Sequence, residues 1–331
     1  VVVSEIAKNK TGKKKIVVAS ILAALAMQSG LITEVMAADP PSARLADAAE
    51  AAGTNGVAIG SSARSKSNQS VAIGYFSVAQ APGANPENPA TAVGAGANAN
   101  GAGTVALGLS ANATGANAVA LGGGSNGGTN KTEATAANAT AVGFNAKASN
   151  SGASAIGTNA KATGENSVAV GSGAGNSGPL GFASSINSSG SVVNTLKTIN
   201  YATTAEGNNA VALGFYANAK NSGVAVGQNA LAATGGVAIG KGVFEDTNNN
   251  LAGGVVIGQD SASTGIYSLA MGRHAFATGS TSMAMGYEAS ANGNFAVAMG
   301  RNVTATETST AIGNHATASN GGLAIGSQEN D

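Results

Sequence analysis

Two histidines are the side chains of this sequence best suited to acid–base or metal chemistry. His274 and His315 lie 41 residues apart, and each follows shortly after a glycine that closes a recurring short motif. A metal site or an acid–base pair needs further groups close by. Asp260 and Glu288 occupy the same kind of position in other copies of the motif. The pattern therefore favours exposed turn residues on a charged face over a catalytic or metal-binding site.

Glycine-rich and threonine-rich segments could indicate phosphate, calcium or ice binding, but their patterns do not fit. The string Gly122-Gly123-Gly124 lacks the lysine and hydroxyl residue that complete a phosphate-binding loop. The calcium-binding pattern Gly-Gly-x-Gly-x-Asp does not occur. Threonines alternate from Thr304 to Thr310, whereas an ice-binding surface needs them in every repeat. We therefore predict a protein that is not an enzyme and has no cofactor and no metal site.

The composition restricts the kind of core that this chain can form. Of 331 residues, 49 are glycine, 10% are charged, 4% are aromatic and none is tryptophan, so large side chains cannot fill a wide core. The formal net charge is zero, but residues 39–331 hold 11 basic and 14 acidic side chains, a net charge of −3. The sequence has no basic patch of the kind that would indicate nucleic-acid binding. The absence of cysteine excludes a disulfide framework.

A short phrase of a β-branched or small residue, Ala or Val, an aliphatic residue and Gly recurs along the chain. It has 17 copies, and the commonest step between them is 14 residues. A fixed period of this length is typical of a solenoid. The closing glycines are Gly60, Gly74, Gly94, Gly108, Gly122, Gly143, Gly157, Gly171, Gly214, Gly227, Gly240, Gly258, Gly272, Gly286, Gly300, Gly313 and Gly326.

One repeat holds two short strands and two turns. In the triplet Val105-Ala106-Leu107 the side chains alternate between two faces, Gly108 permits a chain reversal, and a second alternating segment follows. Glycine recurs too often for a helix, and the apolar period is 2 rather than 3.6. Because one coil buries little, stability must come from stacking coils as parallel strands. The sequence thus predicts an all-β fold, a parallel β-roll of about 14-residue coils.

The middle residue of the triplet is alanine in most copies. We expect the larger flanking residues, such as Val168 and Val170, to point into the roll and the alanines to point outward. A column of outward alanines favours lateral packing against other copies of the chain, although alanine is also abundant throughout. The alanines concerned are Ala58, Ala72, Ala106, Ala120, Ala169, Ala212, Ala225, Ala238, Ala270, Ala284, Ala298 and Ala324.

The N-terminal residues 1–38 resemble a signal peptide. A lysine run at 13–15 precedes an apolar run at 16–27, and small residues at 35–38 suit cleavage. A membrane anchor retained in the mature protein is the alternative, although the apolar run is short for a span. The chain begins with Val, so we expect a trimmed N-terminus. Residues 39–53 are predicted to be a linker with a helical turn or two.

The predicted head runs from residue 54 to 326, and residues 327–331 form the end of the fragment. Turn-rich insertions lengthen four of its steps and should form surface loops. The largest, at about 172–207, is either one or two degenerate coils or a single excursion that returns to the roll, which we favour. The loops expected to be exposed are 80–92, 123–139, 184–206 and 244–252.

The phrase Asn-Ser-Val-Ala-Val-Gly at 166–171 resembles the head repeat of YadA-like trimeric autotransporter adhesins. Residues 1–8, Val-Val-Val-Ser-Glu-Ile-Ala-Lys, with the lysine run after them, resemble the extended signal peptide of that family. The resemblance implies a left-handed roll, a homotrimer, export, and display at the bacterial cell surface on the outer membrane. In the family a coiled-coil stalk and a membrane anchor follow the head. The sequence shows neither, so we expect a fragment that is anchored only through a missing C-terminal region.

The resemblance also implies adhesion to host extracellular matrix or cells, with collagen or fibronectin as partners. Motifs of the Asn-Ser-Val-Ala-Ile-Gly type are associated with collagen binding in the family, and the best match differs only at Val170. A spacer that presents other binding domains and a self-association module that causes autoaggregation are the alternatives. The candidate ligand-binding residues, which are also needed to build the coil, are Asn166, Ser167, Val168, Ala169, Val170 and Gly171.

Overall fold

The computed structural model describes residues 43–46, 48–81, 88–125, 130–173, 181–186, 192–197, 202–245 and 253–326. The predicted signal peptide, the C-terminal end at 327–331 and parts of the four predicted loops lie outside these residues. The described residues contain no helix long and apolar enough to cross a membrane. The chain divides into two compact units, residues 1–132 and 133–331, and each forms a β-solenoid of its own.

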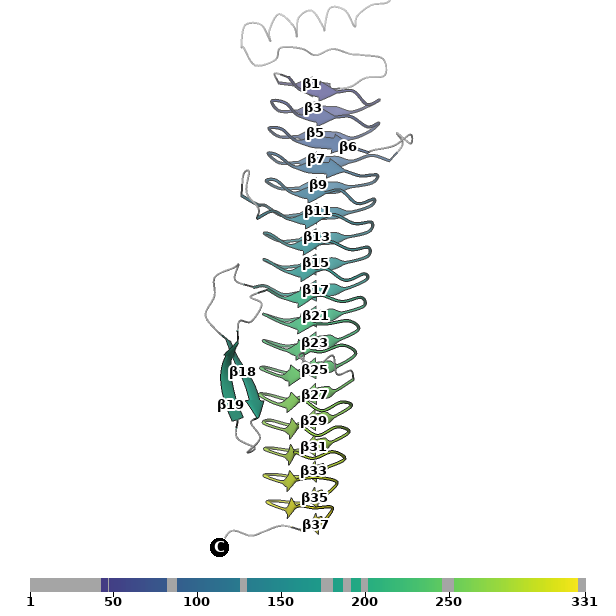
Figure 1. The fold of residues 1–331 in the computed structure, drawn as a ribbon. Helices are drawn as coiled ribbons and strands as arrows, with labels where there is room; N and C mark the ends of the chain where they lie inside the picture. Colours follow the sequence, from purple (N-terminus) through teal and green to yellow (C-terminus); the bar gives the residue numbers. More distant parts are fainter. Residues whose placement is uncertain are drawn as a thin grey trace, which may run out of the picture. The chain divides into compact units, whose positions relative to one another are not determined.

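In the first unit successive strands alternate between two parallel layers, called here sheet A and sheet B (Figure 1). Val105 of one coil pairs with Val119 of the next, 14 residues later, and the longer step from Val71 to Thr91 keeps the same pairing. Sheet A is β1 (Ala43–Leu45), β3 (Val57–Ile59), β5 (Val71–Ile73), β7 (Thr91–Val93), β9 (Val105–Leu107) and β11 (Val119–Leu121). Sheet B is β2 (Glu50–Ala51), β4 (Arg64–Ser65), β6 (Val78–Gln80), β8 (Asn98–Asn100) and β10 (Asn112–Ala113).

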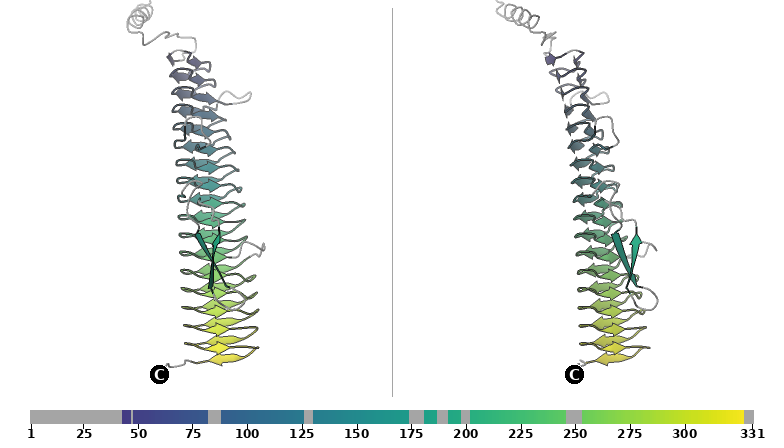
Figure 2. Two further views of the ribbon diagram at one scale, coloured as in Figure 1. Left: turned by 60° about the vertical axis from the view of Figure 1, so that its left-hand side comes forward. Right: turned by 90° about the vertical axis from the view of Figure 1, so that its left-hand side faces the viewer.

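The second unit has the same two layers, and Figure 2 shows its strands stacked coil upon coil. Sheet A is β13 (Thr140–Val142), β15 (Ser154–Ile156), β17 (Val168–Val170), β21 (Val211–Leu213), β23 (Val224–Val226), β25 (Val237–Ile239), β27 (Val255–Ile257), β29 (Leu269–Met271), β31 (Met283–Met285), β33 (Val297–Met299), β35 (Thr310–Ile312) and β37 (Leu323–Ile325). Sheet B is β12 (Glu133–Ala134), β14 (Lys147–Ala148), β16 (Lys161–Ala162), β20 (Thr204–Ala205), β22 (Asn218–Ala219), β24 (Leu231–Ala232), β26 (Phe244–Glu245), β28 (Ala262–Ser263), β30 (Phe276–Ala277), β32 (Ser290–Ala291), β34 (Thr304–Ala305) and β36 (Thr317–Ala318). The predicted all-β solenoid of parallel strands is confirmed in both units.

The core lies between the two sheets and consists of small side chains. In the coil around Gly171, the inward residues Ala160, Ala162, Ser167 and Ala169 are 0% exposed. In this coil the two layers are close-packed through methyl and hydroxymethyl groups. Elsewhere the largest fully buried side chains are no bigger than valine, as at Val256 of β27.

The predicted orientation of the triplet is wrong. All the middle alanines named above are 0% exposed except Ala324 in the last coil, whereas Val168 and Val170 are half-buried on the outer face. Alternation fixes which residues share a face but does not say which face is inside. Because the neighbouring inward positions are also Ala or Ser, the triplet must turn its smallest residue toward the core. Lateral packing through alanine columns is excluded for the same reason.

The closing glycines form a column in which the backbones of successive coils lie against each other. At Gly286 φ is +130°, and a Cβ there would come within 2.0 Å of the Gly300 carbonyl oxygen. Any side chain at this position would therefore meet the next coil as well as strain the backbone. This double restriction explains why glycine closes the triplet in the coils from Gly60 onward.

Stacking begins earlier than the sequence predicts. The strands β1 and β2 lie within the predicted linker. They pair with β3 and β4 in the register of the later coils. The first coil lacks the usual signal because Ala46, with a φ of 138°, stands where later coils have glycine.

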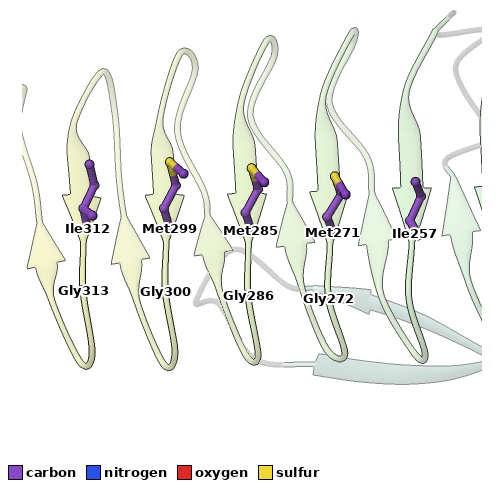
Figure 3. Close-up of a pocket in the computed structure, with 9 residues that line it drawn as sticks. All are labelled: Ile257, Met271, Gly272, Met285, Gly286, Met299, Gly300, Ile312 and Gly313. Atoms are coloured by element: carbon purple, nitrogen blue, oxygen red, sulfur yellow. The ribbon is translucent and has the colours of Figure 1, made fainter.

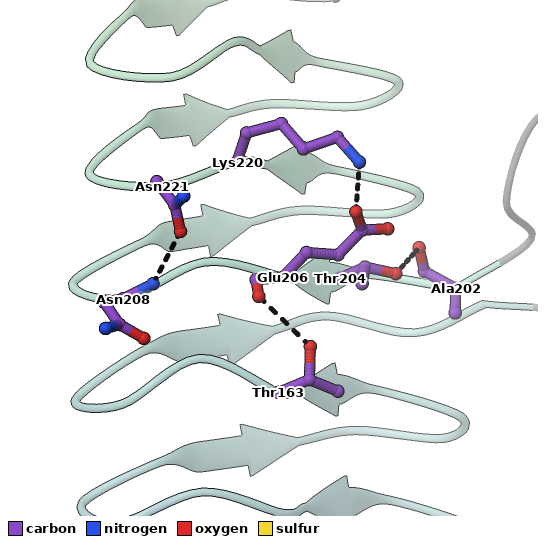
Figure 4. A network of polar contacts seen from close by, with 7 residues as sticks. All are labelled: Thr163, Ala202, Thr204, Glu206, Asn208, Lys220 and Asn221. Atoms are coloured by element: carbon purple, nitrogen blue, oxygen red, sulfur yellow. Dashed lines mark hydrogen bonds and ion pairs between the residues drawn. The ribbon is translucent and has the colours of Figure 1, made fainter.

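The segment between β17 and β21 leaves the stack without breaking it. Its described strands, β18 (Gly181–Ile186) and β19 (Val192–Lys197), pair with each other as an antiparallel hairpin. β17 pairs with β21, and β16 pairs with β20. Figure 4 shows the junction, where the Thr163 hydroxyl donates to the Glu206 carbonyl oxygen at 3.4 Å and the Asn208 N–H donates to Asn221 Oδ1 at 3.0 Å. Coils distant in sequence are thus joined as directly as consecutive ones.

Candidate binding surface

The outer side of sheet A is a continuous apolar surface in each unit, called here the aliphatic face. It consists of the two residues that flank the central residue of each three-residue strand. The position before the closing glycine is Val, Ile, Leu or Met in every described coil. Most of these side chains are half-buried, while Leu107 and Ile156 are 37% and 40% exposed. The other flanking position is aliphatic in most coils and is Thr or Ser in β7, β13, β15 and β35. No charged residue occupies a flanking position in the described three-residue strands of sheet A, so the face is largely apolar.

In the second unit the aliphatic face contains a shallow groove (Figure 3). Methionines of three successive strands point the same way along it, and glycines form the adjacent turns. Methionine adapts its shape to a partner surface better than branched residues do. The lining residues are Ile257, Met271, Gly272, Met285, Gly286, Met299, Gly300, Ile312 and Gly313.

The outer side of sheet B has a different character. Equivalent positions on successive coils carry opposite charges, so that Lys147 Nζ lies 3.1 Å from Glu133 Oε2, and Lys220 contacts Glu206. Elsewhere on this side, Asn98 Nδ2 donates to Asn112 Oδ1 at 2.9 Å. Such side chains remain hydrated, and their pairs contribute little to stability. These positions therefore have the features of a solvent-facing surface, whereas apolar residues occupy the outward positions of β6, β24 and β30 on the same side.

The six predicted ligand-binding residues do not all reach the surface. Ser167 is buried and its hydroxyl donates to the Gly164 carbonyl oxygen at 2.6 Å, and Ala169 is 0% exposed. Gly171 lies in the glycine column, where a Cβ would meet the Gly214 carbonyl oxygen at 2.2 Å. These three residues build the coil.

The remaining three candidates lie where a partner could touch them. Asn166 is exposed on a turn with a φ of 52°, and its backbone N–H donates to the Ser151 carbonyl oxygen at 2.9 Å. Val168 and Val170 belong to the aliphatic face. A partner would therefore make polar contact with Asn166 on the turn and apolar contact with Val168 and Val170 on the sheet.

Both histidines occupy the equivalent turn position, three coils apart, with φ values of 57° and 58°. The structure brings His274 together with the two carboxylates of the neighbouring coils. Its Nε2 lies 3.8 Å from Asp260 Oδ2, and its Nδ1 lies 3.8 Å from Glu288 Oε1. This cluster was not predicted, although the spacing of 14 residues between Asp260, His274 and Glu288 indicates that they lie on neighbouring coils. Within the described ranges no group of three or more His, Asp or Glu side chains could hold a metal ion.

Comparison with known families identifies the coils. The model of the YadA head domain repeat (2 copies) matches residues 51–77, 89–111, 99–125, 134–159, 148–174, 201–217 and 277–302, which together make up a little under half of the chain. No curated protein matches the chain. The matched segments occur in both units and include the coil at 166–171. The predicted resemblance is confirmed: this chain carries YadA head domain repeats.

Proposed function

We propose that the chain is the head of an exported bacterial adhesin displayed at the cell surface, and that three copies pack through their aliphatic faces. The observation that carries this proposal is the column of aliphatic residues before the closing glycines, which continues through every described coil and includes coils that match the YadA head repeat. An apolar surface of this extent is characteristic of an interaction site rather than of a face left in water. The polar outer side of sheet B would then remain available to solvent and ligands.

A trimer provides a physical basis for adhesion. Each surface feature is presented three times, so weak contacts with a repetitive ligand add up to a large avidity. Fibrous matrix proteins such as collagen, and multidomain ones such as fibronectin, offer repeated sites of this kind. We therefore propose attachment to host extracellular matrix, with Asn166 as the motif residue best placed to contact a ligand.

Binding of the full chain to immobilised collagen, fibronectin and laminin tests this function, with the trimer checked by sedimentation. Asn166→Gly removes the side chain while keeping the positive φ accessible, because glycine adopts it without strain. We expect the variant to keep the trimer and to bind its matrix ligand more weakly. Asn138→Gly is the matched control, because Asn138 is exposed on the equivalent turn with a φ of 57°.

The results separate adhesion from the alternatives. Intact trimers that bind none of the three matrix proteins would contradict the proposal and favour a spacer. Trimers that associate further with one another would favour self-association. A monomer in sedimentation would contradict packing through the aliphatic face.

A further inference from the structure

Three turn residues of the second unit form a stacked cluster beside the apolar groove. Arg273, Tyr287 and Arg301 each follow a closing glycine, in three successive coils. The guanidinium carbons of Arg273 and Arg301 lie 5.8 Å and 5.9 Å from the centre of the Tyr287 ring. Cation–π attraction to one ring favours this placement of both guanidinium groups. The cluster therefore presents two positive groups whose conformational freedom is already reduced, which favours binding.

The two arginines are available for a ligand. Both are exposed, and neither forms an ion pair with a carboxylate of the described residues. The chain has only four arginines, so two of them are concentrated at this cluster. A guanidinium group recognises a carboxylate through two parallel hydrogen bonds. These two groups thus suit a ligand with at least two carboxylates.

The spacing of the arginines restricts the ligand. They stand two coils apart, and a coil step of about 4.8 Å places their positions about 10 Å apart along the stack. This separation is close to the length of one disaccharide in an extended polysaccharide. A linear polysaccharide with one uronic acid in each disaccharide would repeat its carboxylate at this interval.

The remaining groups around the cluster suit a sugar better than a simple polyanion. Asp260 and Glu288 flank His274, and their side chains keep 46% and 44% exposure. Their carboxylates would repel a densely charged polymer, but they can accept hydrogen bonds from sugar hydroxyls. The His274 ring stacks near Tyr287, with ring centres 6.2 Å apart. The arginines can bind the carboxylates of such a sugar chain, and the carboxylates of Asp260 and Glu288 can bind its hydroxyls.

We propose that this cluster binds a linear uronic-acid polysaccharide, with Arg273 and Arg301 holding carboxylates of successive disaccharides and Tyr287 positioning both arginines. An acidic peptide is less suitable, because the backbone of the inner coils is already paired with neighbouring coils and offers no edge for strand addition. The site lies within one chain and does not depend on which matrix protein the head binds.

The test is binding of a fluorescent hyaluronan octasaccharide to the full chain, measured by fluorescence anisotropy. Hyaluronan whose carboxylates have been reduced to alcohols is the matched ligand control. We expect the native octasaccharide to bind and the reduced one not to bind. The R273Q/R301Q variant should bind about tenfold more weakly. Y287L should also weaken binding, whereas Y287F keeps the ring and should bind like the original chain.

K66Q/K161Q is the matched protein control, because it removes one positive charge directly after β4 and one from β16, neither of which belongs to the cluster, and should leave binding unchanged. Circular dichroism of each variant verifies that the coils remain folded. Equal binding of native and reduced hyaluronan, unchanged binding by R273Q/R301Q, or equal binding of a polyglutamate peptide would each overturn the inference. Matrix binding and sedimentation of the same samples show whether the adhesion proposal fails separately.

Discussion

The two outer faces of the coils share one backbone design and differ in side chains. In the coil that contains the best motif match, sheet B presents Lys161 outward, the exposed Thr163 follows it, and sheet A presents Val168 and Val170. Both strands place an alanine, Ala162 or Ala169, in the core. The core is therefore the same for both layers, and the flanking residues alone decide whether a face meets water or a partner.

The difference between the two outer faces is tested most directly by placing a charge on the aliphatic face. Met285→Glu should convert the proposed trimer to monomers at micromolar concentration, because association would bury three unpaired carboxylates at roughly several kcal/mol each. Ser290→Glu places the same charge on sheet B of the next strand and should leave the trimer intact. Analytical ultracentrifugation measures both variants. Trimers that persist with Met285→Glu would show that the aliphatic face is not the interface.

A smaller effect is expected from enlarging a core residue. Ala284 is 0% exposed, and Ala284→Leu should lower the free energy of unfolding by about 1–3 kcal/mol, because the neighbouring layer leaves no space for the added groups. Met285→Leu changes the adjacent outward residue and should cost less. Chemical denaturation followed by circular dichroism compares the two. If Ala284→Leu were neutral and Met285→Leu destabilising, the result would contradict the inward placement of Ala284.

The smallest effect is expected on sheet B. Lys147→Gln removes the ion pair with Glu133 and should cost about 0.2–1 kcal/mol at low salt, decreasing as salt screens the charges. Lys161→Gln, in the next coil, provides the reference, since no ion pair of Lys161 occurs among the described residues. The difference between the two unfolding midpoints at low and high salt measures the contribution of the pair. A difference that does not change with salt would contradict this explanation.

The period of the sequence was sufficient to predict the solenoid, because glycine at a fixed interval has one structural consequence: a turn at which backbones meet. The coil at Ala43–Leu45 was missed, since Ala46 occupies the glycine position with a positive φ. The predicted orientation of the triplet failed for another reason. The rule that larger aliphatic residues face inward assumes a core wide enough to hold them, and Ala162 and Ala169 from opposite layers already fill this one.

The side-chain clusters could have been predicted with one further step. Residues 14 apart lie on neighbouring coils, so the series Asp260, His274 and Glu288 predicts a ladder on one turn. The pair of β18 and β19 could not be derived in this way, because its strands follow no period and pair with each other rather than with the coils.

The junction at which β17 meets β21 has a consequence for how such a molecule can change over time. The contacts that hold these coils depend on register and not on the number of residues that connect them. We expect that the intervening segment can be lengthened, shortened or replaced by mutation while the coils on both sides keep their partners. The molecule can thus acquire new sequence at this point without redesign of the scaffold.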